Sequence, residues 1–274
     1  EGSRITRVPI PRGLANEAIP VKNGAHQPKY PSNLFKLHTL TAFIGARGSG
    51  KTNACVLLAR EYLRHHSFTR VFLISPTYES NTIFNELGVD PEDVYQDTHA
   101  CQQALRDILT SMEADRQMFD DAILYKKLYK QWRAKPDSLT PSQLLVLEDM
   151  EFAEPVNHPF PSPLIIIDDM SHSDIFSGAR SNPFINLCLR HRHIFRGTGC
   201  SIFMLLQNFK SHGSIPKALR DNIMQYCIWK VRGLDVLRSI HSEFANLVEF
   251  DTFQQMFELA TQDSDHDFMT VDLN

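Results

Sequence analysis

The chain has 274 residues, a formal net charge of −4 and a hydrophobic fraction of 42%. These values suit one large soluble α/β domain. They exclude a protein that coats nucleic acid over its whole surface, but they leave room for a local basic groove or a positive ring built by several subunits.

Targeting and cysteine usage add further expectations. No apolar run approaches the roughly 20 residues that a transmembrane helix needs, and the start, Glu1 to Arg4, lacks the apolar stretch of a signal peptide. The five cysteines form no CxxC pair. We therefore expect no membrane-spanning segment, no secretion, reduced thiols, and neither a zinc site nor a disulfide framework.

Residues 1–33 predict an extended arm, because they contain five prolines and little helical or strand periodicity. Two interpretations of this arm stay open. It is either a disordered tail or a segment that lies on its own subunit or on a neighbouring one.

From residue 34 to residue 274, apolar strand patterns alternate with helical patterns. This alternation predicts one α/β domain with a mostly parallel sheet and helices on both faces. The expected strands are 37–44, 71–75, 164–168, 201–206, 226–231 and 268–273, and the expected helices are 53–65, 101–133, 137–150, 182–197, 215–223, 234–247 and 252–260.

Helical patterns dominate residues 100–160, which we interpret as a helical insertion into the core. The second helix of this segment has Thr140 as its N-cap, Pro141 at the first helical position and Gln143 closing a capping box. In the first helix, residues 124–133 interleave aromatic and basic side chains. They predict an amphipathic helix with a solvated charged face, and a nucleic-acid contact is the alternative interpretation.

The segment Gly45 to Thr52 reads GARGSGKT and matches G-x-x-x-x-G-K-[ST] at every fixed position. Glycines allow a tight turn whose amide groups face phosphate oxygens, and the following helix adds its positive N-terminal dipole. Lys51 supplies charge to the β- and γ-phosphates, and the Thr52 hydroxyl binds Mg²⁺. We predict that ATP contacts Gly45, Ala46, Arg47, Gly48, Ser49, Gly50, Lys51, Thr52 and Asn53.

A second motif, LIIIDD over residues 164–169, has the form of a Walker B strand. An apolar strand that ends in an acid places a carboxylate beside the phosphate loop. We predict that Asp168 holds Mg²⁺ and that Asp169 is the general base for an attacking water. The alternative is a pair of acids in a turn that ends the strand.

Three further polar residues are candidates for roles in hydrolysis. Gln207 follows the expected strand 201–206. If that strand lies between the phosphate-loop strand and the Walker B strand, Gln207 faces the γ-phosphate and orients water. In ring-forming hydrolases an arginine from a neighbouring subunit stabilises the charge of the transition state, and Arg220 and Arg192 are the leading candidates.

These motifs together resemble the FtsK–HerA superfamily, and most closely the poxvirus-type genome-packaging ATPases of large DNA viruses, virophages and Polinton-like elements. The chain has no NKxD motif, which disfavours a GTPase. The resemblance runs from about residue 34 to the C-terminus. It rests on FIGARGSGKT, RVFLISPTYESN, PLIIIDDM, LRHRHIF, CSIFMLLQNF and IPKALRDNI. The helical segment before the Walker B strand matches no motif of the family.

The resemblance implies a RecA-like (ASCE) P-loop core that forms a homo-oligomeric ring around double-stranded DNA. It also implies that ATP hydrolysis with Mg²⁺ drives a viral genome into a preformed capsid, with capsid or vertex proteins as partners. The expected location is the viral assembly site in the host cytoplasm or nucleus, or the virion. Another nucleic-acid ATPase, such as a helicase or a conjugation-type pump, and a nucleotide-gated assembly scaffold remain as alternatives.

Overall fold

The computed structural model describes residues 28–170, 173–176, 182–207, 209 and 215–273. Most of the expected arm, residues 1–27, therefore lies outside the described residues. Its last residues, 28–33, belong to neither a helix nor a strand. Lys29 is held to the body, because its carbonyl oxygen accepts a hydrogen bond from Ser67 Oγ at 2.7 Å.

A seven-stranded sheet forms the centre of the molecule, with the order β3-β2-β4-β5-β1-β6-β7. All neighbouring strands pair in parallel except β7, which is antiparallel to β6. The strands are β1 (Leu40–Ile44), β2 (Arg70–Ile74), β3 (Val94–Tyr95), β4 (Pro163–Ile167), β5 (Ser201–Leu206), β6 (Ile223–Trp229) and β7 (Phe268–Asp272).

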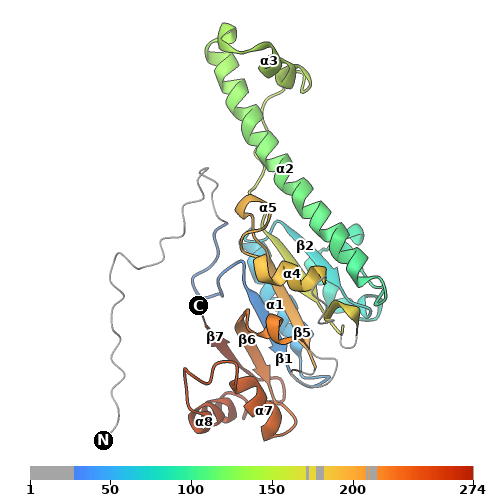
Figure 1. The fold of residues 1–274 in the computed structure, drawn as a ribbon, viewed down its shortest axis with the longest axis vertical. Helices are drawn as coiled ribbons and strands as arrows, with labels where there is room; N and C mark the ends of the chain where they lie inside the picture. Colours follow the sequence, from blue (N-terminus) through green and yellow to red (C-terminus); the bar gives the residue numbers. More distant parts are fainter. Residues whose placement is uncertain (1–27, 171–172, 177–181, 208, 210–214, 274) are drawn as a thin grey trace, which may run out of the picture.

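Helices cover both faces of this sheet, as the alternating pattern predicts (Figure 1). They are α1 (Lys51–Arg64), α2 (Cys101–Ala134), α3 (Pro141–Glu148), α4 (Pro183–Arg190), α5 (Ile194–Gly197), α6 (Lys217–Arg220), α7 (Leu234–His241) and α8 (Phe250–Ala260). The apolar side chains of α1 pack on one face of the sheet. Those of α2, α4, α7 and α8 pack on the other face. In the described ranges, no helix is long and apolar enough to cross a membrane.

Alternate residues along each strand enter these two cores, because successive side chains of a strand point to opposite faces. Ala42 and Ile44 lie on the α4 and α7 side, whereas Phe43 lies on the α1 side. Both neighbours of β1 are parallel strands, and its five residues are buried. A strand buried on both faces reads as a continuous apolar run, which explains the signal in the sequence.

Several helices end earlier than their patterns predict. The helix expected over 182–197 ends at Arg190, and the positive φ angles of Phe195 and Arg196, 44° and 59°, exclude a continuous helix to residue 197. The helix expected over 215–223 is limited to Lys217–Arg220, and Ile223 already begins β6. The helix expected over 234–247 ends at His241. The capping box at Thr140 is confirmed, since Thr140 Oγ1 accepts from the Gln143 amide and the Gln143 side chain accepts from the Thr140 amide.

Candidate functional site: a phosphate loop at the carboxyl edge of the sheet

The phosphate loop joins the end of β1 to the start of α1, in the strand–loop–helix context that its motif requires. Gly48 and Gly50 have φ angles of 79° and 96°, which favour glycine. Gly45 is required for a different reason. A Cβ atom there would lie 2.7 Å from Cβ of Trp229 on β6. The glycines thus permit both the turn of the loop and its close approach to the sheet.

Lys51 is the first residue of α1 and is only 7% exposed. Its ammonium group donates hydrogen bonds to the carbonyl oxygens of Gly45 at 2.9 Å and Ala46 at 2.8 Å, so it lies inside the curve of the loop. Burial lowers the pKa of Lys51, and the charges of Asp168 and Asp169 partly oppose that shift. Lys51 therefore places a cation where the loop amides converge.

Asp168 follows the last residue of β4 and lies beside the start of α1. Its Oδ2 atom accepts a hydrogen bond of 3.4 Å from Thr52 Oγ1. Burial, with a smaller contribution from the neighbouring charge of Asp169, raises the pKa of Asp168 to about 6. The buried Asp168 carboxylate and the Thr52 hydroxyl thus place two hard oxygen ligands next to each other. These residues fit Mg²⁺, which binds through one or two protein oxygens while water and phosphate complete its shell.

Asp169 points to a different partner. Its backbone has a φ angle of 52°, in the left-handed region. Its Oδ1 atom accepts a hydrogen bond of 2.7 Å from Gln207 Nε2. β4 and β5 are neighbours in the sheet, and β5 lies between β4 and β1. The structure thus brings Gln207 to the carboxyl edge, beside the two acids.

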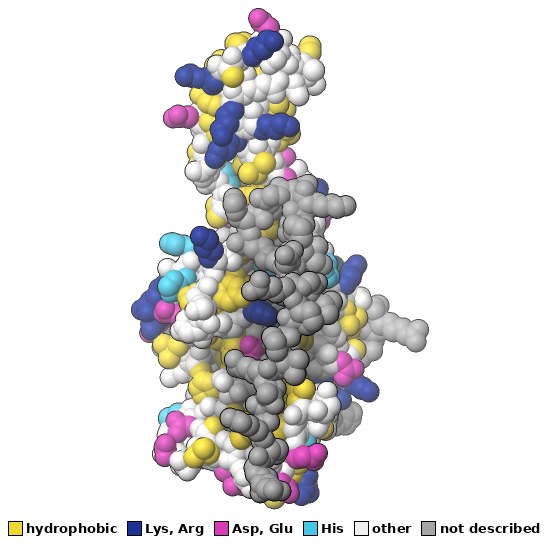
Figure 2. All heavy atoms as spheres, turned by 90° about the vertical axis from the view of Figure 1, so that its left-hand side faces the viewer, with side chains coloured by type: hydrophobic (Ala, Val, Ile, Leu, Met, Phe, Trp, Pro, Cys, Tyr) yellow, Lys and Arg dark blue, Asp and Glu magenta, His cyan; other side chains and the backbone are white. Residues whose placement is uncertain are grey.

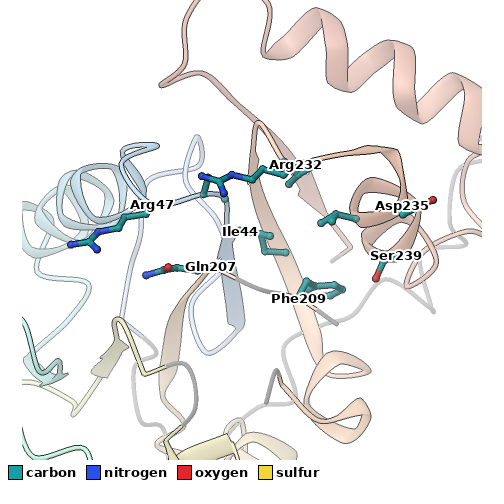
Figure 3. A pocket seen from close by; sticks show the side chains of 11 residues that line it. Ile44, Arg47, Gln207, Phe209, Arg232, Asp235 and Ser239 are labelled. Carbon is teal, nitrogen blue, oxygen red and sulfur yellow. The ribbon is translucent and has the colours of Figure 1, made fainter. Parts of the chain in front are cut away.

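A cavity of about 460 Å³ extends from this edge, and Figure 3 shows the side chains that line it. Ile44 and Phe209 are its apolar lining residues near the ends of β1 and β5. Gln207 lies at the phosphate-loop end, and the guanidinium of Arg232 extends over the cavity toward that end. The remaining lining residues are Gly45, Ala46, Arg47, Val231, Asp235, Val236 and Ser239.

Arg220 does not reach the phosphate loop of its own chain, and its action on a neighbouring subunit stays a prediction. It belongs to α6, which precedes β6 and so lies at the opposite edge of the sheet. Its guanidinium donates to Glu243 at 3.1 Å and to the Ile215 carbonyl at 2.7 Å. The side chains of Arg220 and Glu243 are 16% and 10% exposed. In this chain the Arg220 guanidinium is therefore engaged with Glu243 and the Ile215 carbonyl.

Arg192 also lies at the opposite edge. The carbonyl of its neighbour His191 accepts from the amide of Cys200, which directly precedes β5. Arg192 is exposed, and in the part of the chain that the structure describes it takes part in no ion pair. It therefore cannot act on the phosphate loop of its own chain, and a role toward a neighbouring subunit stays a prediction. Asn53 is exposed in the first turn of α1.

Sequence reasoning missed three residues that support or flank the loop. Trp229 ends β6, and its indole donates to the His266 carbonyl at 3.0 Å. The His266 ring lies 3.3 Å from the Ser49 carbonyl and would meet a Cβ at Gly50 at the same distance. Arg232 is exposed beside the cavity. No local motif marks these residues, because they reach the loop only through the pairing of β1, β6 and β7.

Comparison with known proteins agrees with this architecture. The family of PhoH-like proteins matches residues 20–128. That range includes the phosphate loop but neither Asp168, Asp169 nor Gln207, and it is less than half of the chain. No curated protein matches the chain in sequence.

Solved structures share the fold at low sequence identity. B204, the DNA-packaging ATPase of Sulfolobus turreted icosahedral virus, has a TM-score of 0.52 at 12% identity, over 88% of this chain and 95% of that one. The pCW3 conjugation coupling protein TcpA, a monomer with ATPγS, has a TM-score of 0.41 at 14% identity, over 75% and 52% of the two chains. The second score is too low to support an argument.

These findings confirm the predicted fold. The strand order, the phosphate loop and the likeness to B204 are those of a RecA-like P-loop NTPase with a mostly parallel sheet. The predicted similarity to viral genome-packaging ATPases is confirmed at the level of the fold. The chain is therefore a P-loop NTPase by its fold and its phosphate loop.

Proposed function

We propose that this protein hydrolyses ATP to ADP and phosphate and uses the reaction to move double-stranded DNA into a viral capsid. The contact between Asp169 and Gln207 carries the hydrolysis part of this proposal. It joins the residue after the Walker B acid to the end of the intervening strand, at the same edge as Lys51. A carboxylate that a neighbouring amide orients beside the phosphate loop is suited to position and deprotonate water.

The chain's own residues divide the chemistry among them. The loop amides and Lys51 bind and orient the triphosphate, and their positive charge favours the transition state more than the ground state. Thr52 and Asp168 would hold Mg²⁺, which neutralises phosphate charge when it is bound. Asp169 takes a proton from the attacking water, and Gln207 holds Asp169 in place.

The packaging part of the proposal draws on the likeness to B204, a DNA-packaging ATPase, and on the sequence motifs that resemble this class. It includes a homo-oligomeric ring around the duplex, a capsid or vertex protein as partner, and action at the viral assembly site in the host cytoplasm or nucleus, or in the virion. An arginine from the adjacent subunit completes the site.

The test is the rate of ATP hydrolysis with and without duplex DNA, with Mg²⁺ present, together with the mass of the assembled species. We expect duplex DNA to raise the rate in an oligomer. Lys51→Ala should lower the rate at least about 100-fold, because it removes a charged donor from the phosphates. Lys36→Ala, a change at an exposed lysine outside the loop, serves as the matched control and should leave the rate unchanged.

Three outcomes would contradict the proposal in different ways. A rate that duplex DNA leaves unchanged in an assembled ring would refute the motor function. Strand separation without capsid association would favour a helicase or a conjugation-type pump. Nucleotide binding that drives assembly, with a hydrolysis rate that Asp169→Asn does not lower, would favour an assembly scaffold.

A further inference from the structure

The longest helix continues well beyond the ATPase core. The first part of α2 is buried in the main core through Cys101, Leu105, Ile108 and Met112. Further along the helix, Asp120 forms an ion pair with Arg196 on α5. The remaining 14 residues, 121–134, extend about 21 Å at the rise of an α-helix. Figure 1 shows α2 rising from the sheet with α3 at its far end.

This far end, which we call the tip (residues 121–153), has a small core of its own. Leu128 and Leu147 are 2% and 0% exposed and pack with Tyr125 and Leu139. Further rings extend the cluster, and the centroids of Trp132 and Phe152 lie 4.8 Å apart. The Tyr125 hydroxyl donates to the Ala153 carbonyl at 2.6 Å. The tip is therefore an ordered platform and not a frayed helix end.

On the outer side of α2 in the tip, the charged side chains are all cations. Successive residues of a helix are about 100° apart, so Lys126, Lys127, Lys130 and Arg133 share a sector of roughly 120° that points away from Tyr125 and Leu128. Lys135 follows just after the helix. No Asp or Glu occurs between residues 122 and 136. We call these five residues, Lys126, Lys127, Lys130, Arg133 and Lys135, the basic face.

No carboxylate among the described residues pairs with the basic face. Lys126 donates to the amide oxygen of Asn157 at 2.6 Å. Across the described ranges of the chain, none of the five cations takes part in an ion pair. Lys127, Lys130, Arg133 and Lys135 are exposed. The upper lobe in Figure 2 shows Lys and Arg side chains gathered on the tip.

The position of the aromatic side chains favours duplex over single-stranded nucleic acid as the ligand of the basic face. Tyr129 and Trp132 alternate with the cations in the sequence, but their rings pack together in the tip core, with centroids 5.6 Å apart. Both rings are only partly exposed, whereas tight binding of single-stranded nucleic acid uses aromatic rings that are open to stack on the bases. Cations without aromatic platforms contact phosphates, independently of base sequence.

We propose that the basic face binds the phosphate backbone of duplex DNA. This inference rests on the proposed function, and it names the surface that touches the polymer. The tip extends from the edge of the sheet opposite the phosphate loop, since Arg116 in the preceding turns of α2 donates to Thr198, just before β5. DNA bound to the basic face therefore lies away from the ATP site. Changes in the tip should therefore leave basal hydrolysis unaffected.

The experiment measures binding of a duplex DNA oligomer to the full chain at several salt concentrations, without nucleotide. The variant is Lys127→Gln, Lys130→Gln and Arg133→Gln combined, since glutamine keeps helix propensity close to that of lysine and arginine. The slope of log K against log salt is negative, and each lost phosphate contact reduces its magnitude by about 0.9. We expect the magnitude of the slope to decrease by about 2 to 3 and the affinity at moderate salt to fall on the order of 10-fold or more.

The matched control removes two exposed acids of the tip and the exposed acid directly after it: Glu148→Gln, Asp149→Asn and Glu154→Gln. We expect it to bind duplex DNA at least as well as the wild type. Basal ATP hydrolysis should be the same in both variants, whereas its stimulation by DNA should be lost in the basic-face variant alone. Helix content measured by circular dichroism confirms that each variant is folded.

Two results would overturn the inference. An unchanged salt slope and affinity in the basic-face variant would show that DNA binds elsewhere. A lower oligomer mass with unchanged DNA binding would assign the basic face to a neighbouring subunit. Absence of hydrolysis by the wild type would refute the proposed function instead, and the binding measurement, which needs no nucleotide, would still test the basic face.

Discussion

At the scale of single residues, the two consecutive acids after β4 have separate partners because of one backbone conformation. Asp169 has a φ angle of 52°, and Asp and Asn are among the few residues that tolerate this region. The turn sends Asp168 to Thr52 and Asp169 to Gln207. The Asp168 carboxylate can therefore bind Mg²⁺ while the adjacent Asp169 carboxylate accepts a proton from water, because the two point to different positions.

This geometry makes Asp169→Asn a sharp test of the general base. Asparagine tolerates the same φ angle, and its Oδ1 atom still accepts from Gln207, so the local structure should persist. The side chain can no longer take a proton, and we expect kcat to fall by a factor of about 10² to 10⁴. Nucleotide affinity should stay the same, and equilibrium binding of ATP measures this directly. An unchanged kcat would remove Asp169 from the mechanism.

At the scale of elements, Arg220 joins α6 to the residues that follow α7. Its guanidinium pairs with Glu243 and also donates to the Ile215 carbonyl. Both side chains of the pair are largely buried. The nearby Tyr226 has a raised pKa because its own hydroxyl is buried, and the charge of Glu243 adds to this shift while that of Arg220 opposes it. The helix therefore holds the segment before β6 onto the sheet.

Removing one partner of this pair should destabilise the protein. Arg220→Ala leaves the Glu243 carboxylate buried without its cation, and we expect the free energy of unfolding to fall by about 3 kcal/mol. Arg192→Ala, at an exposed position, should change it by less than about 0.5 kcal/mol. Urea denaturation measures both. If Arg220→Ala is as stable as the wild type but inactive in hydrolysis, Arg220 has a catalytic role after all.

At the scale of the whole molecule, the sheet separates two regions. The ATP site lies at the carboxyl edge, and the tip extends from the amino edge. Two histidines, His38 before β1 and His191 after α4, lie near the amino edge. His191 is 4% exposed, and its Nδ1 atom lies 2.6 Å from the Cys188 carbonyl. Burial lowers the pKa values of His191 and His38 to about 4, and the charge of His191 adds to the shift of His38.

These histidines predict a loss of stability in mild acid. The unfolded chain binds protons near pH 6.5, whereas the folded chain does so only near pH 4, so the unfolded state holds more protons in this window and stability falls as the pH falls. We expect His191 alone to account for up to about 3 kcal/mol by the acid end of the window. Urea unfolding between pH 7 and 4.5 measures this dependence. His191→Gln should show a shallower slope, and an identical slope would contradict the assignment.

The sequence alone determined every feature that depends on neighbours along the chain. The phosphate loop, every strand except the two-residue β3 and the capping box at Thr140 were all predictable, because periodicity and capping act over a few residues. Gln207 was predicted from its position after a strand. It reaches Asp169 only because β5 pairs with β4.

The tertiary structure decided what depends on contacts between distant segments. It paired Arg220 with Glu243 and ended the helix expected over 182–197 at Arg190. It also buried the aromatic side of residues 124–133 in the tip and left the cations outside. A local pattern shows that a helix has two faces, but it does not show which face finds a partner. That choice depends on long-range packing, which here determines both the ATP site and the basic face.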